Sequence, residues 1–126
     1  MLSLITHPDY DIPLPDGHRF PASKFSHLMQ CLERDGVVNG FHIMHPECAS
    51  KQDLAVTQDP AYVAAIADGT LDAAALRVLG LQWSATLARR SFLAVNGTLL
   101  AARQALTHGL ACHAAGGTHH AHHDYG

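Results

Sequence analysis

The sequence lacks three features that would each point to a particular class of protein. No stretch approaches the roughly 18 consecutive apolar residues that a membrane-spanning helix needs. Four of the first five residues are apolar, but His7-Pro8-Asp9 follows almost at once, so the charged start and longer apolar core of a secretion signal are missing. The three cysteines, Cys31, Cys48 and Cys112, are an odd number at wide spacings, which argues against a disulfide framework. We therefore expect a protein of the reducing cytoplasm.

A long stretch of the sequence also lacks carboxylates. The chain has eleven acidic residues, yet residues 73–123 contain four arginines and neither Asp nor Glu. The net charge of −3, counted with neutral histidine, gives no basic excess that would draw the chain to nucleic acid or to a membrane. We therefore expect neither kind of partner, while the oligomeric state stays open.

What is present fits one globular domain. The chain has 126 residues, of which 48% are hydrophobic and 15% charged, so it is neither disordered nor large enough for two domains. Histidine is the abundant functional residue: eleven occur, and six of them lie in the last nineteen residues.

The hydrophobic pattern predicts alternating strands and helices. We expect strands at residues 2–6, 40–45 and 110–113, a loop at 7–21, and helices at 23–35, 60–68, 70–80 and 85–108. Ser23, Asp59, Thr70 and Ser84 are the expected N-caps. This order indicates an α/β fold with a parallel sheet.

The helix over residues 85–108 is expected to be the longest element. Apolar and small residues lie on one of its faces and should pack against a sheet or another helix; these are Leu87, Ser91, Ala94, Val95, Thr98, Ala102, Ala105 and Leu106. Its arginines Arg89, Arg90 and Arg103 are expected to face water. Gly97 costs about 1 kcal/mol relative to Ala within a helix, so we expect a kink or a close contact there.

The segment after the last predicted strand is the candidate for chemistry. In Gly116-Gly117-Thr118-His119-His120-Ala121 two glycines allow backbone to approach a ligand, and two imidazoles follow. Histidine exchanges protons near neutral pH, so one ring could take a proton from water while the other gives one to a leaving group. His119 and His120 are therefore the candidate catalytic residues.

Two other interpretations of this segment remain open. A histidine pair also occurs in loops without a function. Alternatively, His119, His120, His122 and His123 form a small metal-binding or interaction module that catalyses nothing. The cluster His45-Pro46-Glu47-Cys48 carries metal-capable side chains as well, but no second cluster completes a site, so we interpret it as a loop.

The motif Gly116–Ala121 resembles the tandem-histidine loop of the histone deacetylase family, which includes acetoin-utilisation and acetylpolyamine amidohydrolases. Further blocks match in the same order over essentially all 126 residues. They are His7-Pro8-Asp9-Tyr10, residues 14–21, Asp59-Pro60-Ala61-Tyr62-Val63, residues 81–84, Arg89-Arg90-Ser91 and residues 97–102.

The resemblance implies a fold and a reaction. The fold is a three-layer α/β/α domain around a parallel sheet, as in arginases, and the reaction is zinc-dependent hydrolysis of an acetyl-amide on lysine or a small amine. His120 would be the general base and acid, and His119 would stabilise developing charge.

The sequence departs from the family in one respect. The family's zinc ligands, an Asp-x-His pair and a later Asp, lie beyond the tandem histidines, and no position up to Gly126 matches them. We therefore expect residues 1–126 to be the N-terminal portion of a single deacetylase domain, with no metal ligand of its own and no activity alone. A pseudoenzyme that regulates a paralogue is a further alternative.

Overall fold

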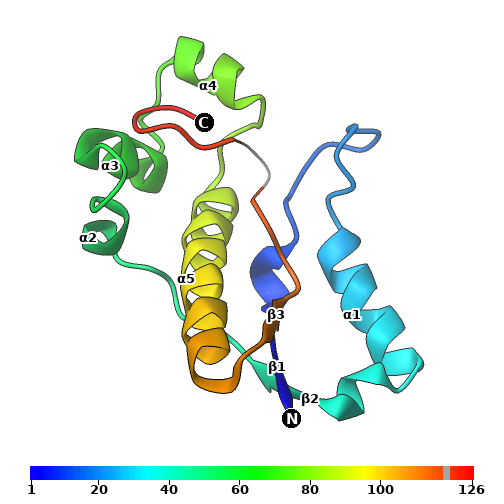
Figure 1. Cartoon of the computed structure of the whole chain (residues 1–126). Helices are drawn as coiled ribbons and strands as arrows, with labels where there is room; N and C mark the ends of the chain where they lie inside the picture. The colour runs from blue at the N-terminus through cyan, green and yellow to red at the C-terminus, as the bar shows by residue number, and fades with distance from the viewer. Residues whose placement is uncertain (118–119) are drawn as a thin grey trace.

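The computed structural model describes residues 1–117 and 120–126. Three parallel strands form one sheet in the order β2-β1-β3 (Figure 1), with β1 at Leu2–Ile5, β2 at Phe41–Met44 and β3 at Ala111–His113. Ile5 of the central strand lies opposite Met44 on one side and His113 on the other. The predicted α/β fold with a parallel sheet is confirmed.

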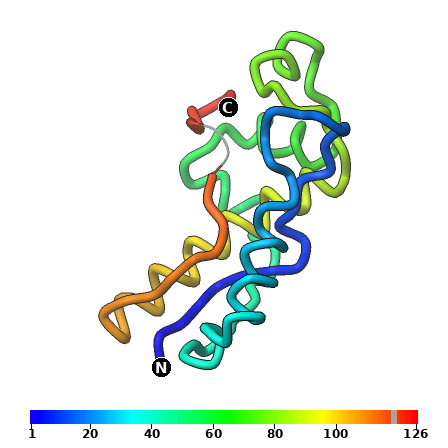
Figure 2. The backbone as a smooth tube through the Cα atoms, turned by 90° about the vertical axis from the view of Figure 1, so that its right-hand side faces the viewer, coloured from blue at the N-terminus to red at the C-terminus, as the bar shows by residue number. Residues whose placement is uncertain are grey.

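Helices connect the strands and cover the sheet. They are η1 (Pro8–Tyr10), α1 (Lys24–Arg34), η2 (Val37–Gly40), α2 (Lys51–Leu54), α3 (Pro60–Asp68), α4 (Ala73–Leu79) and α5 (Ala85–His108). α5 packs on β1 and β3, and α1 lies on the other side of the sheet, as Figures 1 and 2 show from two directions. The part of the chain described therefore has the three layers that the resemblance implies, with the sheet between α5 and α1.

Local capping explains why α3 and α5 begin and end where the sequence predicts. Asp59 Oδ1 accepts hydrogen bonds from the N–H groups of Ala61 and Tyr62, and Pro60 stands in the first turn of α3, where no N–H is needed. Ser84 Oγ accepts from the N–H of Leu87 at the start of α5. Both helices match their predicted bounds.

Other helix starts differ from the prediction. The Ser23 side chain makes no capping bond, because its backbone (φ −94°, ψ 12°) is already close to helical. α4 begins after Asp72, whose Oδ1 accepts from the N–H of Ala75 at 2.8 Å, and not after Thr70. The short helix α2 was not expected; Ser50 and Asp53 form a reciprocal capping box that stabilises it.

The segment expected to be a loop at residues 7–21 supplies part of the core. Tyr10 is fully buried and Ile12 is 3% exposed, and both pack with Phe25 of α1 and Leu93 of α5. The prediction that this proline-rich segment is not helical is wrong at η1, a single 3-10 turn that places the Tyr10 ring in the core.

α5 confirms one prediction about its side chains and contradicts two others. A Cβ at Gly97 would overlap the Tyr10 hydroxyl and the His113 imidazole, so the predicted close contact is confirmed. Arg90, expected to face water, is only 3% exposed. Leu106, expected on the packing face of α5, is 89% exposed, whereas Leu87 and Ala94 on the same face are buried.

Across the ranges described, no helix combines the length and hydropathy needed to cross a membrane.

Candidate functional site

The carboxyl ends of the three strands meet at one edge of the sheet, where ligands bind in parallel α/β folds. β1 leads into His7, β2 into His45, and β3 ends at His113 before the glycines of the predicted catalytic loop. These three segments are joined to α5 by the polar contacts described below.

His113 lies in a partly buried chain of hydrogen bonds at the end of β3. Thr98 Oγ1 donates to the Ala94 carbonyl, so it accepts from His113 Nδ1–H at 3.3 Å. His113 Nε2 is then free to accept from the Tyr10 hydroxyl at 2.8 Å. Burial raises the pKa of Tyr10 to about 12, which keeps this hydroxyl protonated. The arrangement holds His113 in its neutral form.

Protonation of His113 is unfavourable in the folded state. Burial is the largest cause that lowers its pKa from the ordinary value, and the nearby Arg90 guanidinium adds to it. The pKa of His7 is lowered too, again mainly by burial. His7 Nδ1 accepts from the Asp9 N–H at 3.0 Å, so its 3.9 Å approach to the Asp9 carboxylate is not an ion pair at neutral pH.

We expect the protein to lose stability as the pH falls from 7.5 to 5.5. The unfolded chain binds protons at histidine near pH 6.5, whereas folded His113 and His7 resist protonation, so stability is complete above that value and declines below it. Urea midpoints at the two pH values measure the loss, and His113→Asn should reduce it. An unchanged difference in midpoint for this variant would contradict the assignment.

Arg90 ties α5 to the start of the predicted catalytic loop. Its Nε donates to the Tyr10 carbonyl and its Nη2 to the Gly116 carbonyl, both at 3.1 Å. The guanidinium carbon also lies 5.0 Å from the centroid of the Phe25 ring. Burial lowers the pKa of Arg90, but the ordinary value is so high that the side chain stays charged. One buried cation therefore fixes backbone on two sides of the site.

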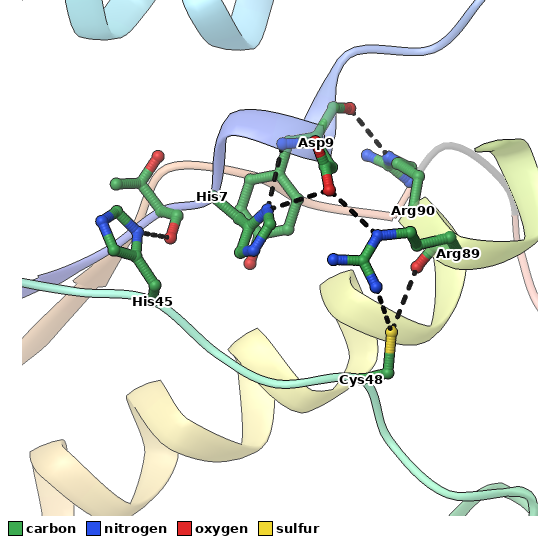
Figure 3. A network of polar contacts seen from close by, with 8 residues as sticks. His7, Asp9, His45, Cys48, Arg89 and Arg90 are labelled. Atoms are coloured by element: carbon green, nitrogen blue, oxygen red, sulfur yellow. Dashed lines mark hydrogen bonds and ion pairs between the residues drawn. The ribbon is translucent and has the colours of Figure 1, made fainter.

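A second, exposed network surrounds Arg89 (Figure 3). Arg89 Nε donates to the Asp9 carboxylate at 2.9 Å, and its Nη1 lies 3.5 Å from Cys48 Sγ. His45 Nδ1 donates to the Thr6 carbonyl at 2.7 Å, which links the ends of β1 and β2. His45 and Cys48 thus connect the segment after β2 to β1 and to α5, in keeping with the interpretation of this cluster as a loop.

Only one residue of the predicted catalytic pair lies in the described part of the chain. His119 lies outside the described residues. His120 is exposed, in the segment that follows β3 and its glycines. This segment returns to the turn before α3, where Gln58 Nε2 donates to the His122 carbonyl and the Asp59 N–H donates to the His123 carbonyl, both at 2.8 Å.

His122 and His123 have structural partners. The His122 ring stacks on Tyr125 with 4.1 Å between centroids, and His123 Nδ1 donates to the Thr57 carbonyl at 2.9 Å. Within residues 1–117 and 120–126, no three His, Cys, Asp or Glu side chains are grouped so that they could hold a metal ion. The alternative of a metal-binding histidine tail therefore gains no support from the residues described.

An apolar cavity of about 290 Å³ lies beside the loop. Tyr62, Trp83 and Leu87 line it from the helical side, and Gly117 and Ala121 line it from the loop side. Among the described residues on either side of His120, Gly116 is held by Arg90, and His122 is held by Gln58.

Comparison with known proteins gives the family. A family model described as the histone deacetylase domain matches residues 18–126, which include the whole tandem-histidine motif. The chain belongs to the histone deacetylase family. It is also 46% identical over 123 residues to an uncharacterised protein of Picosynechococcus sp., a match that covers 98% of this chain. The chain spans 41% of the length of that relative.

The sequence did not predict two contacts that position the loop, those of Arg90 and the bond between His113 and Tyr10. Arg90 is one of four arginines in an acid-free region, and nothing in its local pattern separates it from its exposed neighbour Arg89. The bond between His113 and Tyr10 joins residues 103 positions apart. Only the glycine at position 97 signalled that something approaches α5 closely at this point.

Proposed function

We propose that this chain is the N-terminal portion of a zinc-dependent deacetylase that hydrolyses acetyl-amides on lysine or on a small amine. The family match across the tandem-histidine motif supports the proposal, because it covers the residues that would transfer protons. The unpaired cysteines and the net charge of −3 favour a cytoplasmic enzyme that acts without nucleic acid or membrane.

His120 would carry the proton transfers of this reaction. Its imidazole accepts a proton from the attacking water, which adds to the acetyl carbonyl, and then gives the proton to the departing amine as the carbon–nitrogen bond breaks. The products are acetate and the free amine. His119 would stabilise the negative charge that develops on the carbonyl oxygen.

The described residues do not fit a zinc site by themselves. A catalytic zinc needs three protein ligands and an open position, and no such group of side chains is present in the two ranges that the structure describes. By resemblance the Asp-x-His and Asp ligands belong to a further part of the domain.

Joining the two parts tests the proposal. We expect residues 1–126 alone to release no amine from a fluorogenic acetyl-lysine substrate, even with zinc present. A single polypeptide in which residues 1–126 replace the matching region of the Picosynechococcus relative should release it. Activity in the 126-residue chain, or no activity of a folded, zinc-loaded joined protein on acetyl-lysine and acetylpolyamine substrates, would overturn the proposal.

A further inference from the structure

A shallow hollow of about 440 Å³ lies between β2 and the last turns of α5. Two imidazoles and two thioethers border it, those of His42, His108, Met1 and Met44. His42 and His108 are exposed, and Met44 is half-buried. Neither histidine takes part in the contacts described for the candidate functional site. Nitrogen and sulfur donors therefore gather at a second place in the fold.

The register of the sheet puts the two donors of β2 on one face. Ser3 of β1 pairs with His42, and Ile5 pairs with Met44. Side chains alternate along a strand, so His42 and Met44 point to the same side of the sheet and lie about 6.6 Å apart along the strand. The Ser3 hydroxyl donates to Gln104 Oε1 of α5 at 3.1 Å, so this is the side that α5 covers.

α5 brings a third donor to the hollow. His108 is the last residue of α5 and follows Gln104 by one turn, so both side chains lie on the same face of the helix. Because Gln104 binds Ser3, that face is turned to the sheet. α5 packs on β1 and β3, and its last turn lies at the same end of the molecule as the start of β1 (Figures 1 and 2). His108 therefore borders the hollow from the helix, as His42 does from the strand.

The two imidazoles are available as ligands. Within residues 1–117 and 120–126, the rings of His42 and His108 make no hydrogen bond or ion pair. His45 and His113 differ, because their ring nitrogens are taken up by the Thr6 carbonyl and by the Tyr10 hydroxyl. The exposure of His42 and His108 also leaves a metal ion a path into the hollow.

The donors favour a soft metal ion. Thioether sulfur suits Cu(I), whereas Mg²⁺ and Ca²⁺ prefer oxygen ligands. Neither a carboxylate nor a thiol lines the hollow, so a harder divalent ion would find no anionic ligand there. His108 also ends α5, and the negative end of a helix dipole favours a cation.

We propose that His42, Met44 and His108 form a binding site for Cu(I), with one nitrogen of each imidazole and the Met44 sulfur as ligands. Met1 is 87% exposed at the end of the chain and is not assigned as a ligand. Binding needs no electron transfer, because the ion enters and stays as Cu(I). The site does not depend on the proposed deacetylase activity, since it uses no residue of the predicted catalytic loop.

Methionine methyl groups report on the site directly. The chain has three methionines, Met1, Met29 and Met44, so ¹³C-labelled methyl groups give three NMR signals. The three free cysteines are first replaced by alanine, because thiolates would compete for the metal. Ag⁺ is the probe, since it is a soft monovalent ion that does not change oxidation state. We expect an equimolar amount of Ag⁺ to shift the Met44 signal and to leave that of Met29, in α1, in place.

Matched variants identify the nitrogen ligands. His42→Ala and His108→Ala should each raise the Ag⁺ concentration at the midpoint of the Met44 shift by about tenfold or more, because each removes a ligand. His27→Ala changes an exposed histidine of α1 and should leave the midpoint unchanged.

Competition with bathocuproine disulfonate in the absence of oxygen measures the affinity for Cu(I) itself. Met44→Leu removes the sulfur but keeps a similar side-chain volume, so it should weaken Cu(I) binding without disturbing the packing of β2. Circular dichroism checks that each variant keeps its helices. If the cysteine-free chain does not fold, the same methyl signals are followed in the intact chain with Ag⁺ in excess of its three thiols.

Four results would overturn the copper site: a Met44 signal that does not move, a Met29 signal that moves as far, an equal change of midpoint for His27→Ala, or displacement of Ag⁺ by an equal concentration of Zn²⁺. The last result would assign the two imidazoles to a harder metal ion that does not use the thioether.

Discussion

Replacing His120 by Ala in the joined polypeptide is expected to lower kcat by about 10²–10⁴-fold, the usual contribution of a general acid–base group. His120 is exposed at the carboxyl edge of the sheet and belongs to a segment fixed at both ends, so its loss should remove proton transfer without disturbing the core. KM should change little, because in the proposed mechanism the imidazole transfers a proton and makes no binding contact with the substrate. Steady-state kinetics on a fluorogenic acetyl-lysine substrate measures both constants.

His27→Ala provides the matched control. His27 is an exposed histidine of α1, outside the strand ends that form the candidate site, and its replacement should leave kcat unchanged. The pH profile adds a second readout. In the His120→Ala variant, kcat should no longer show the fall at low pH that protonation of a general base causes. A loss of less than tenfold, or an equal loss for His27→Ala, would refute the assignment of His120.

Replacing Arg90 by Met is expected to destabilise the fold by about 3 kcal/mol. The change leaves the buried carbonyl of Tyr10 and the partly buried bond to the Gly116 carbonyl without their donor, and it removes the cation from the face of Phe25. Lys at this position should recover only part of the loss, because an ammonium lacks the planar fork that reaches both carbonyls. Urea denaturation of residues 1–126 at pH 7.5 gives the free energies of unfolding.

Arg89→Met is the neighbouring control. Arg89 forms its ion pair with Asp9 at the surface, where the two side chains are 53% and 46% exposed, so its loss should cost about 1 kcal/mol or less. Equal destabilisation by the two substitutions would show that Arg90 has no special part in holding the loop.

Local signals predicted the regular elements well. The pair Asp59-Pro60 defines the start of α3, Ser84 defines the start of α5, and glycines follow the last residue of each helix. The capping residues Asp59 and Ser84 act within two or three residues, through a side-chain oxygen that accepts from nearby N–H groups. The prediction was wrong at α4, where two capping residues stand close together and Asp72, not Thr70, caps the helix.

The site was harder to predict because its contacts join distant parts of the chain. Periodicity put Arg90 on a polar face of α5, but a carbonyl of η1 and a carbonyl after β3 converge on it in the fold. The predicted packing face of α5 was wrong in the opposite direction at its C-terminal end, where Leu106 is 89% exposed, although Leu87 and Ala94 on the same face are buried. The prediction of His119 and His120 as the catalytic pair rests on the resemblance and on histidine chemistry, and neither argument identifies the acids that would orient the two rings.

The long-range contacts described around the predicted catalytic loop run backwards along the chain. His113 binds Tyr10, Gly116 binds Arg90, and the segment 122–123 binds residues 57–59. A ribosome releases those earlier residues first, and domains form from the N-terminus as synthesis proceeds. These contacts therefore need no partner from later in the sequence, and they can form on the nascent polypeptide as soon as the loop has left the ribosome.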